Sequence, residues 1–399
     1  MKHQTLFCPS TEVLNIRLKY LATICNGQDY KDVVDDDGEY PVIGSGGPFA
    51  RATDYLYDQA SVLLGRKGTI DNPLYVDYPF WTVDTMFYTR VKSIVSAKYL
   101  YYLAKTIPFD YYKYGSAIPS MTQRDLGNIC FPVPRDDDVK NKIVDYLDSR
   151  TAAIDSVLSE KKTLIELLQE KKTSMICAAV VKGIHSNVAL KDSFVDWLGE
   201  VPAHWHILTN HQLFAERNIK CNEPDAVLLS VTKHLGVILQ SQAEEMNLAT
   251  VAPAETTEGY KVVRKGDLVM NIMRAKDGSY GISDYDGVIS PAYCIYYTRQ
   301  EANPQYLYYL FKTPMYMEIF KNYSTGIAEH RMRLYPVSFF KIPVVVPPLE
   351  EQNEIVAYLD KRVKDIDEIV SLTRQQIEKL KEYRQSIISE VVTGKVAVE

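Results

Sequence analysis

The chain has 399 residues, enough for two or three domains, and its 46% hydrophobic and 24% charged residues are those of an ordinary globular protein. Its formal net charge of −6 argues against a protein that coats nucleic acid without specificity. Six scattered cysteines without a CxxC pair, and no apolar signal-peptide core or membrane-length apolar run, predict a cytoplasmic protein with reduced thiols.

Two β-rich regions of similar size are predicted along the chain, at residues 16–134 and 205–347. In both regions short apolar runs are bounded by Gly, Asp and Pro, which is typical of strands in a mixed α/β domain. The expected strands are residues 40–47, 61–64, 82–89, 262–263, 267–273 and 293–298. Each region ends in a proline-rich extended stretch, because prolines end the sheet and set the direction of the element that follows.

A long helix is predicted after each β-rich region, because residues 136–181 and 349–393 contain neither proline nor glycine. Positions spaced alternately by three and four residues form a coiled-coil seam. The seam positions are Thr151, Ile154, Leu158, Lys161, Ile165, Leu168, Lys172, Met175 and Ala179, and then Val363, Ile366, Val370, Thr373, Ile377, Leu380, Arg384, Ile387 and Val391. We predict that the two helices pair as an antiparallel coiled coil, with pairing between two chains as the alternative.

An internal duplication relates the two halves of the chain. The sequence IVDYLD at 143–148 recurs as IVAYLD at 355–360, which is 212 positions later, and YLYYL at 99–103 recurs at 306–310. Such a long period indicates two copies of one folded unit.

The predicted fold class is therefore α/β (α+β), with a pseudo-twofold internal repeat of a β-rich domain and a long helix. The predicted boundaries are 1–134 for the first domain, 135–185 for the first helix, 186–347 for a linker and the second domain, and 348–399 for the second helix.

Both domains carry a basic turn at matched places, residues 64–68 and 273–278, with two cations beside a glycine. Such turns can approach a phosphate backbone, and Arg or Lys can reach guanine edges. The alternative for each of these residues is an ordinary solvated side chain. The predicted DNA-binding residues are Ser45, Arg51, Arg66, Lys67, Lys113, Gln123, Arg124, Lys233, His234, Arg274, Lys276, His330, Arg331 and Arg333.

The sequence shows no catalytic motif. The seven histidines form no HExxH pattern, and neither a GxSxG elbow nor a methyltransferase Asn/Asp-Pro-Pro-aromatic loop is present. We therefore predict that the chain is not an enzyme and binds no metal or cofactor of its own.

The chain resembles the DNA-specificity subunits of type I restriction–modification systems. The resemblance rests on the duplicated helix sequences, the tail at 391–394 and the joining stretch 191–205, which reads KDSxVxWLGEVPxHW. Residues 41–47 and 65–68 look like a common type of first domain in that family. No counterpart of the joining stretch precedes the first domain, so we expect the N-terminal part to be shorter than in the family.

The resemblance implies a set of partners and separate roles for the two domains and the two helices. Residues 1–134 and 186–347 would be target-recognition domains, each reading one half of a split, asymmetric site in double-stranded DNA. The helices would space the two halves and dock two methyltransferase (modification) subunits, which bring S-adenosylmethionine, and restriction subunits would be able to join.

A first prediction follows from the expected role of the helices as a spacer. Deleting one heptad from each helix is expected to shorten the nonspecific spacer between the two half-sites. A helix rises a fixed distance per residue and DNA rises a fixed distance per base pair, so a shorter helix spans fewer base pairs. The measurement is a map of methylated sites for the variant, and an unchanged spacer would contradict the prediction.

A function of a different class is a coiled-coil scaffold whose β-rich domains bind protein or carbohydrate. The 29 tyrosines and the negative net charge favour this alternative, because tyrosine is enriched at protein interfaces. Steep salt-dependent binding to a duplex by the chain with its methyltransferase partner would exclude it.

Overall fold

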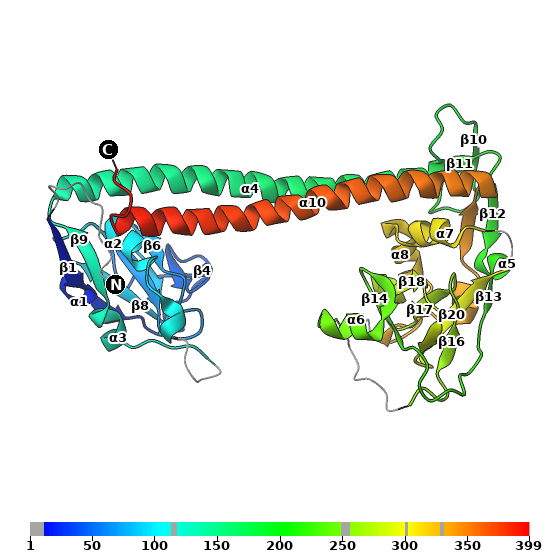
Figure 1. Ribbon diagram of the computed structural model, residues 1–399, viewed down its shortest axis with the longest axis horizontal. Helices are drawn as coiled ribbons and strands as arrows, with labels where there is room; N and C mark the ends of the chain where they lie inside the picture. The colour runs from blue at the N-terminus through cyan, green and yellow to red at the C-terminus, as the bar shows by residue number, and fades with distance from the viewer. Residues whose placement is uncertain (1–11, 113–117, 249–255, 300–301, 328–330, 399) are drawn as a thin grey trace. The chain divides into compact units, whose positions relative to one another are not determined.

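The computed structural model describes residues 12–112, 118–248, 256–299, 302–327 and 331–398. The chain divides into two compact units: unit 1 contains Met1–Thr163 and Thr373–Glu399, and unit 2 contains Leu164–Leu372. Among the described residues, no helix is long and apolar enough to cross a membrane. The predicted plan, a β-rich domain followed by a long helix and then repeated, is confirmed (Figure 1).

An antiparallel four-stranded sheet with the order β2-β8-β5-β6 forms the centre of unit 1. The central strand β5 reads SVLLG and is buried along its whole length, as expected of an apolar run with neighbours on both sides. A sheet β4-β3-β7 and the pair β1-β9 complete the strands. The strands of unit 1 are β1 (Val13–Arg17), β2 (Ala22–Asn26), β3 (Tyr40–Gly44), β4 (Gly47–Ala52), β5 (Ser61–Gly65), β6 (Leu74–Val76), β7 (Trp81–Thr82), β8 (Met86–Val91) and β9 (Cys130–Pro134).

Unit 2 repeats this sheet with the order β13-β20-β17-β18, and its central strand β17 is again buried throughout. The pairs β10-β11, β12-β21, β14-β15 and β16-β19 accompany it. The strands of unit 2 are β10 (Leu190–Asp192), β11 (Glu200–Pro202), β12 (His206–Thr209), β13 (Phe214–Glu216), β14 (Leu229–Thr232), β15 (Gly236–Leu239), β16 (Lys261–Val263), β17 (Leu268–Asn271), β18 (Tyr280–Ile282), β19 (Gly287–Ile289), β20 (Tyr293–Thr298) and β21 (Pro343–Val346).

Short helices flank both sheets, and some of them are capped at their starts by side chains. Ser96 accepts a hydrogen bond from the Tyr99 N–H at the start of α2, and Asn303 does the same for Gln305 at the start of α7. The short helices are α1 (Leu18–Leu21), α2 (Ala97–Ala104), η1 (Phe109–Tyr112), α3 (Gln123–Asn128), α5 (Asn210–Leu213), α6 (Gln240–Glu245), η2 (Ala275–Asp277), α7 (Pro304–Phe311), α8 (Pro314–Asn322) and α9 (Pro336–Phe339).

Three predicted strands were wrong in extent, because main-chain turns interrupt them. The run 40–47 breaks after Gly44, where β3 ends and a turn leads into β4. The run 82–89 breaks at a turn closed by the Met86 N–H, which donates to the Val83 carbonyl at 3.0 Å. The run 267–273 ends at Asn271, whose carbonyl accepts from the Arg274 N–H at 3.0 Å.

The two long helices are α4 (Asp137–Lys182) and α10 (Leu349–Val392), close to the predicted bounds. Every predicted seam position on both helices is buried or half-buried, whereas their opposite faces are exposed. Within unit 2, the start of α10 lies beside the end of α4, so the pairing is antiparallel (Figure 1). Each helix ends before a glycine with a positive φ, Gly183 at 81° and Gly394 at 71°, as the stop signal predicts.

Charged residues at two seam positions pair with acids on the other helix. In unit 1 the Arg384 guanidinium donates to both oxygens of Asp155, at 2.9 and 3.0 Å. In unit 2 the Lys172 ammonium donates to both oxygens of Asp367, at 2.6 and 2.7 Å. The internal repeat makes Lys172 equivalent to Arg384 and Asp155 equivalent to Asp367, so the same ion pair occurs in both units.

A second duplicated contact attaches each β-rich domain to a long helix. In unit 1 the Tyr102 hydroxyl of α2 donates to the Asp148 carboxylate of α4. In unit 2 the Tyr309 hydroxyl of α7 donates to the Asp360 carboxylate of α10 at 2.6 Å. Burial, together with the accepting carboxylate, raises the pKa of both hydroxyls, which therefore remain protonated donors. The recurring YLYYL and YLD sequences thus meet each other in space.

Replacing Tyr309 by Phe is expected to lower the free energy of unfolding of unit 2 by about 1.5 kcal/mol, because it removes a hydrogen bond to a charged group. The value is at the lower end of the usual range because the carboxylate keeps access to water. Tyr102→Phe should act equally in unit 1. Urea denaturation checks the values, with Tyr383→Phe as the control because that side chain is 56% exposed. An equal effect of all three substitutions would contradict the prediction.

Candidate nucleic-acid interface

The basic turn of unit 1 follows the central strand β5. The Arg66 guanidinium donates to the Asp84 carbonyl at 3.1 Å, while the Lys67 side chain is exposed. The Met121 N–H donates to the Arg66 carbonyl at 3.0 Å, which places the turn beside the polar segment 119–124. Two of the predicted groups of residues are therefore adjacent in the structure.

The glycine-rich turn between β3 and β4 lies near the same loop. Residues 44–49 and 83–85, with Tyr30, line an open pocket of about 510 Å³. The Ser45 carbonyl accepts a hydrogen bond from the Asn72 amide at 3.1 Å, so a side chain from another loop holds the turn. Ser45 and the Arg66 turn therefore both adjoin residues 84–85.

The basic turn of unit 2 follows the central strand β17 in the same way. Gly278, with φ of 86°, closes the turn that carries Arg274, whose side chain is exposed. The Leu334 N–H donates to the Ile272 carbonyl at 2.9 Å, which brings the neighbouring Arg333 close to this turn.

A hairpin between β14 and β15 carries Lys233 and His234 on its exposed turn. Gly236, at the start of β15, has φ of 68° and packs against Gly281 of β18. A Cβ on Gly281 would lie 2.7 Å from the Gly236 Cα. The main chain of the hairpin therefore packs directly against the main chain of the sheet.

We call residues 44–47 and 66–68 of unit 1, and residues 232–236 and 274–278 of unit 2, the tip turns.

Some predicted residues already have local partners. The Arg51 guanidinium donates to the Gly38 and Glu39 carbonyls, both at 2.8 Å, and Lys276 pairs with Asp277 at 3.2 Å. These two cations therefore contribute to the structure of their own loops. Besides Arg51, the exposed cations of the predicted set are Lys67, Arg124, Lys233, Arg274, Arg331 and Arg333. Lys113 and His330 lie outside the described residues.

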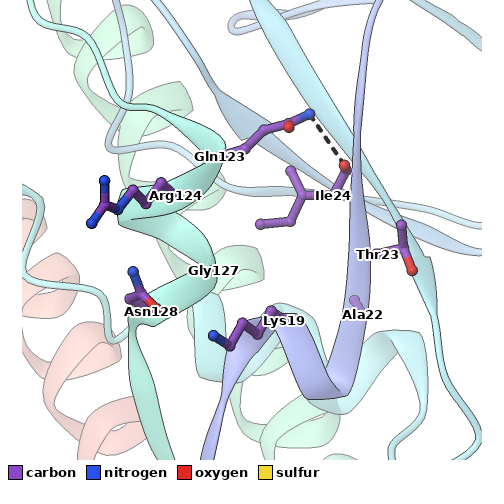
Figure 2. A pocket seen from close by; sticks show the side chains of 8 residues that line it. All are labelled: Lys19, Ala22, Thr23, Ile24, Gln123, Arg124, Gly127 and Asn128. Atoms are coloured by element: carbon purple, nitrogen blue, oxygen red, sulfur yellow. Dashed lines mark hydrogen bonds between the residues drawn. The ribbon is translucent and has the colours of Figure 1, made fainter.

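Lys19, which was not among the predicted residues, lines an open pocket of about 510 Å³ with Arg124 of α3. Figure 2 shows both cations around it, and shows the Gln123 amide reaching the Ile24 carbonyl at 3.2 Å. The described lining residues include no carboxylate, so the pocket suits an anion such as a DNA phosphate. Lys19 is far from Arg124 in the sequence, and the pairing of β1 with β9 and the Leu18 N–H, which donates to the Ile129 carbonyl at 2.8 Å, bring the two segments together.

A metal-binding group of three or more His, Cys, Asp or Glu side chains is not found within the part of the chain that the structure describes. The tip turns combine cationic and hydroxyl side chains with the main-chain groups of glycine-containing turns. These groups can bind phosphate oxygens and base edges.

Comparisons with known proteins give one family. The family model described as "Type I restriction modification DNA specificity domain" matches residues 12–167 and 241–382. The specificity subunit of the type I restriction enzyme MjaVIII from Methanocaldococcus jannaschii is 23% identical over 311 residues, covering 71% of this chain and 66% of that subunit. The chain thus spans slightly less than two thirds of that relative's length. The specificity subunit of EcoDI from Escherichia coli is 19% identical over 419 residues, covering 96% and 88%.

Solved structures show the same fold. A chain from a structural study of complex assembly and conformational transition of the type I R-M system matches with a TM-score of 0.68 and 15% identity, covering 98% of this chain and 99% of that chain. The HsdS subunit from Thermoanaerobacter tengcongensis matches with a TM-score of 0.51 and 16% identity, covering 98% of both chains. Because the family model matches more than half of its residues, the chain belongs to the family of type I restriction–modification DNA-specificity proteins.

Proposed function

We propose that the chain is the DNA-specificity subunit of a type I restriction–modification complex in the cytoplasm. Residues 1–134 and 186–347 are its two target-recognition domains, and each reads one half of a split, asymmetric site in double-stranded DNA through its tip turns. The chain itself is non-catalytic. S-adenosylmethionine and the methyl transfer belong to two methyltransferase subunits, and restriction subunits add to the same assembly.

One observation carries this proposal: the two units share a sheet but differ in their turns. Both place a cationic turn after the equivalent central strand, β5 or β17, and set the segment before α3 or α9 beside it. The turns themselves differ in sequence and length, since residues 65–68 read GRKG and residues 274–278 read RAKDG. A common scaffold with different contact residues is what two readers of different sequences require.

Exposed apolar residues on the long helices support docking of the methyltransferase subunits. Val157 is 39% exposed and Tyr383 is 56% exposed in unit 1. In unit 2, Leu167, Ile369 and Leu372 are 56%, 46% and 51% exposed. None of these residues belongs to the seam. Apolar side chains on the outer face of a charged helix fit burial by a partner subunit.

The test is methylome sequencing of a host that carries this chain and its methyltransferase partner. The expected result is a methylated site with two different specific parts separated by a fixed nonspecific spacer. Duplex binding by the purified complex should fall steeply with salt, because phosphate contacts release counterions. Methylation without a bipartite site, or binding that does not respond to salt, would contradict the proposal.

A further inference from the structure

The duplicated sequence extends three positions beyond YLYYL, and two of these positions, a lysine and a threonine, are identical in the two copies. The chain reads YLYYLAKT at 99–106 and YLYYLFKT at 306–313, so Lys105 and Lys312 are equivalent. Both lysines cap the C-terminus of their helix, α2 or α7, with matching main-chain bonds. Neither lysine was among the residues predicted from the sequence, although the repeat marks both.

In unit 2, Lys312 joins the two tip turns. Its ammonium donates to the Lys233 carbonyl at 2.9 Å and to the Gly278 carbonyl at 2.5 Å. It also lies 4.7 Å from the Tyr280 ring centroid and 5.3 Å from that of Tyr308. The side chain is half-buried, so its charge is directed at these groups and not at bulk solvent.

In unit 1, Lys105 reaches a tip turn through one intermediate side chain. Its ammonium donates to the Asn72 side-chain oxygen at 3.2 Å and lies 5.3 Å from the Tyr101 ring centroid. The Asn72 amide then donates to the Ser45 carbonyl at 3.1 Å. Lys105, Asn72 and Ser45 thus form a chain from the end of α2 to the turn 44–47.

We propose that Lys105 and Lys312 are positioning residues on the helices that pack against the long helices. Lys312 holds both tip turns of unit 2, and Lys105 holds the tip turn 44–47 of unit 1. The proposal rests on the proposed function, in which these turns contact DNA. The tip turns that the two lysines hold differ in sequence, whereas the lysine, its helix and its capping bonds are the same. The repeat therefore keeps the support constant while the contacting residues vary.

The surroundings of both ammonium groups also predict a dependence on pH. Burial, aided by the charge of Lys233, lowers the pKa of Lys312 from 10.5 to about 8; Tyr280 and Tyr308 are the other groups that face it. Burial, aided by the charge of Arg384, likewise lowers the pKa of Lys105 to about 8 against the opposing effects of Asp155 and Asp71. Each group is therefore charged at pH 7 and loses its proton as the pH rises past about 8. Charge-assisted bonds to the carbonyls then weaken, and the attraction to the rings is lost.

The experiment uses the full chain in complex with its methyltransferase subunits. The probes are a duplex with the methylated site and duplexes with one base pair changed in one half-site. The ratio of the affinities for the intact and the changed duplex gives a discrimination value for each half-site. The variants are Lys312→Met and Lys105→Met, and Lys341→Met is the control because Lys341 is an exposed lysine of unit 2.

Lys312→Met is expected to lower discrimination at one half-site by at least about fivefold, the loss of one weak base contact, and to leave the other half-site unchanged. Lys105→Met should give the reverse, and Lys341→Met should change neither. The slope of log affinity against log salt should stay constant, whereas removing a direct phosphate contact lowers it by about 0.9. In the wild-type complex, discrimination should fall several-fold between pH 7 and pH 9.

The positioning role would be overturned if both Met variants kept wild-type discrimination, or if one variant lost discrimination equally at both half-sites. A lower slope of log affinity against log salt in the Met variants would also overturn it. If the Met variants fail to fold, a flat pH profile of the wild-type complex overturns it instead. A wild-type complex that binds every duplex equally would refute the proposed function itself. Failure of the proposed function and failure of the positioning role therefore give different results.

Discussion

Trp205→Ala is expected to lower the free energy of unfolding of unit 2 by about 3–5 kcal/mol, the usual loss for a large buried aromatic residue. Trp205 is fully buried, and its indole N–H donates to the Glu351 carboxylate of α10 at 2.9 Å. It belongs to the same core cluster as Val180 of α4 and Ile355 of α10. The substitution removes this packing and also one donor to a buried acid. The measurement is the urea midpoint of the transition that hydrogen exchange assigns to residues 164–372.

The control is Phe194→Ala in the same joining stretch. Phe194 is 91% exposed and has φ of 55°, so its ring buries little apolar surface. We expect a change within about 0.5 kcal/mol for this variant, as for other surface positions. A loss below about 1.5 kcal/mol for Trp205→Ala would mean that the cluster does not depend on the indole ring.

Arg274→Ala is expected to weaken binding of the complex to its own site by roughly 5–150-fold, which corresponds to the loss of one base contact of about 1–3 kcal/mol. Arg274 is exposed on the tip turn after β17, and the structure records no hydrogen bond to its guanidinium among the described residues. The loss should relax sequence preference at one position of one half-site. Lys67→Ala is expected to act on the other half-site only.

The matched control is Lys265→Ala, since Lys265 is an exposed cation that precedes β17 at the end of the strand opposite to Arg274. Its loss should change affinity by less than about twofold. Competition binding with duplexes altered at single positions separates the outcomes. Equal effects of Arg274→Ala and Lys265→Ala would show that the tip turn of unit 2 does not read the DNA.

The parts of the fold that could be predicted from the sequence depend on periodicity and repetition. The seam was predicted because a coiled-coil partner requires apolar or paired residues at fixed spacings, and all of its positions are buried or half-buried. The internal repeat correctly predicted two copies of one domain, because the repeated sequences make equivalent packing contacts in both units. In unit 1 this is seen where Tyr102 contacts Asp148.

The candidate site was less predictable because it depends on contacts between distant segments. Arg51 is of a residue type that commonly contacts DNA, yet its guanidinium donates hydrogen bonds to two carbonyls of a neighbouring loop. Lys19 lies beside Arg124 because long-range contacts, among them the pairing of β1 with β9, bring the start of the domain to its end. The sequence pattern carries no information about either arrangement.

The duplicated ion pair of the seam makes each long helix complementary to itself. Helix α4 carries the acid Asp155 and the cation Lys172, and α10 carries Asp367 and Arg384 the same distance apart. Two copies of either helix set antiparallel would therefore match acid to cation twice. We therefore expect that a chain with one β-rich domain and one such helix would find the same two ion pairs in an antiparallel homodimer.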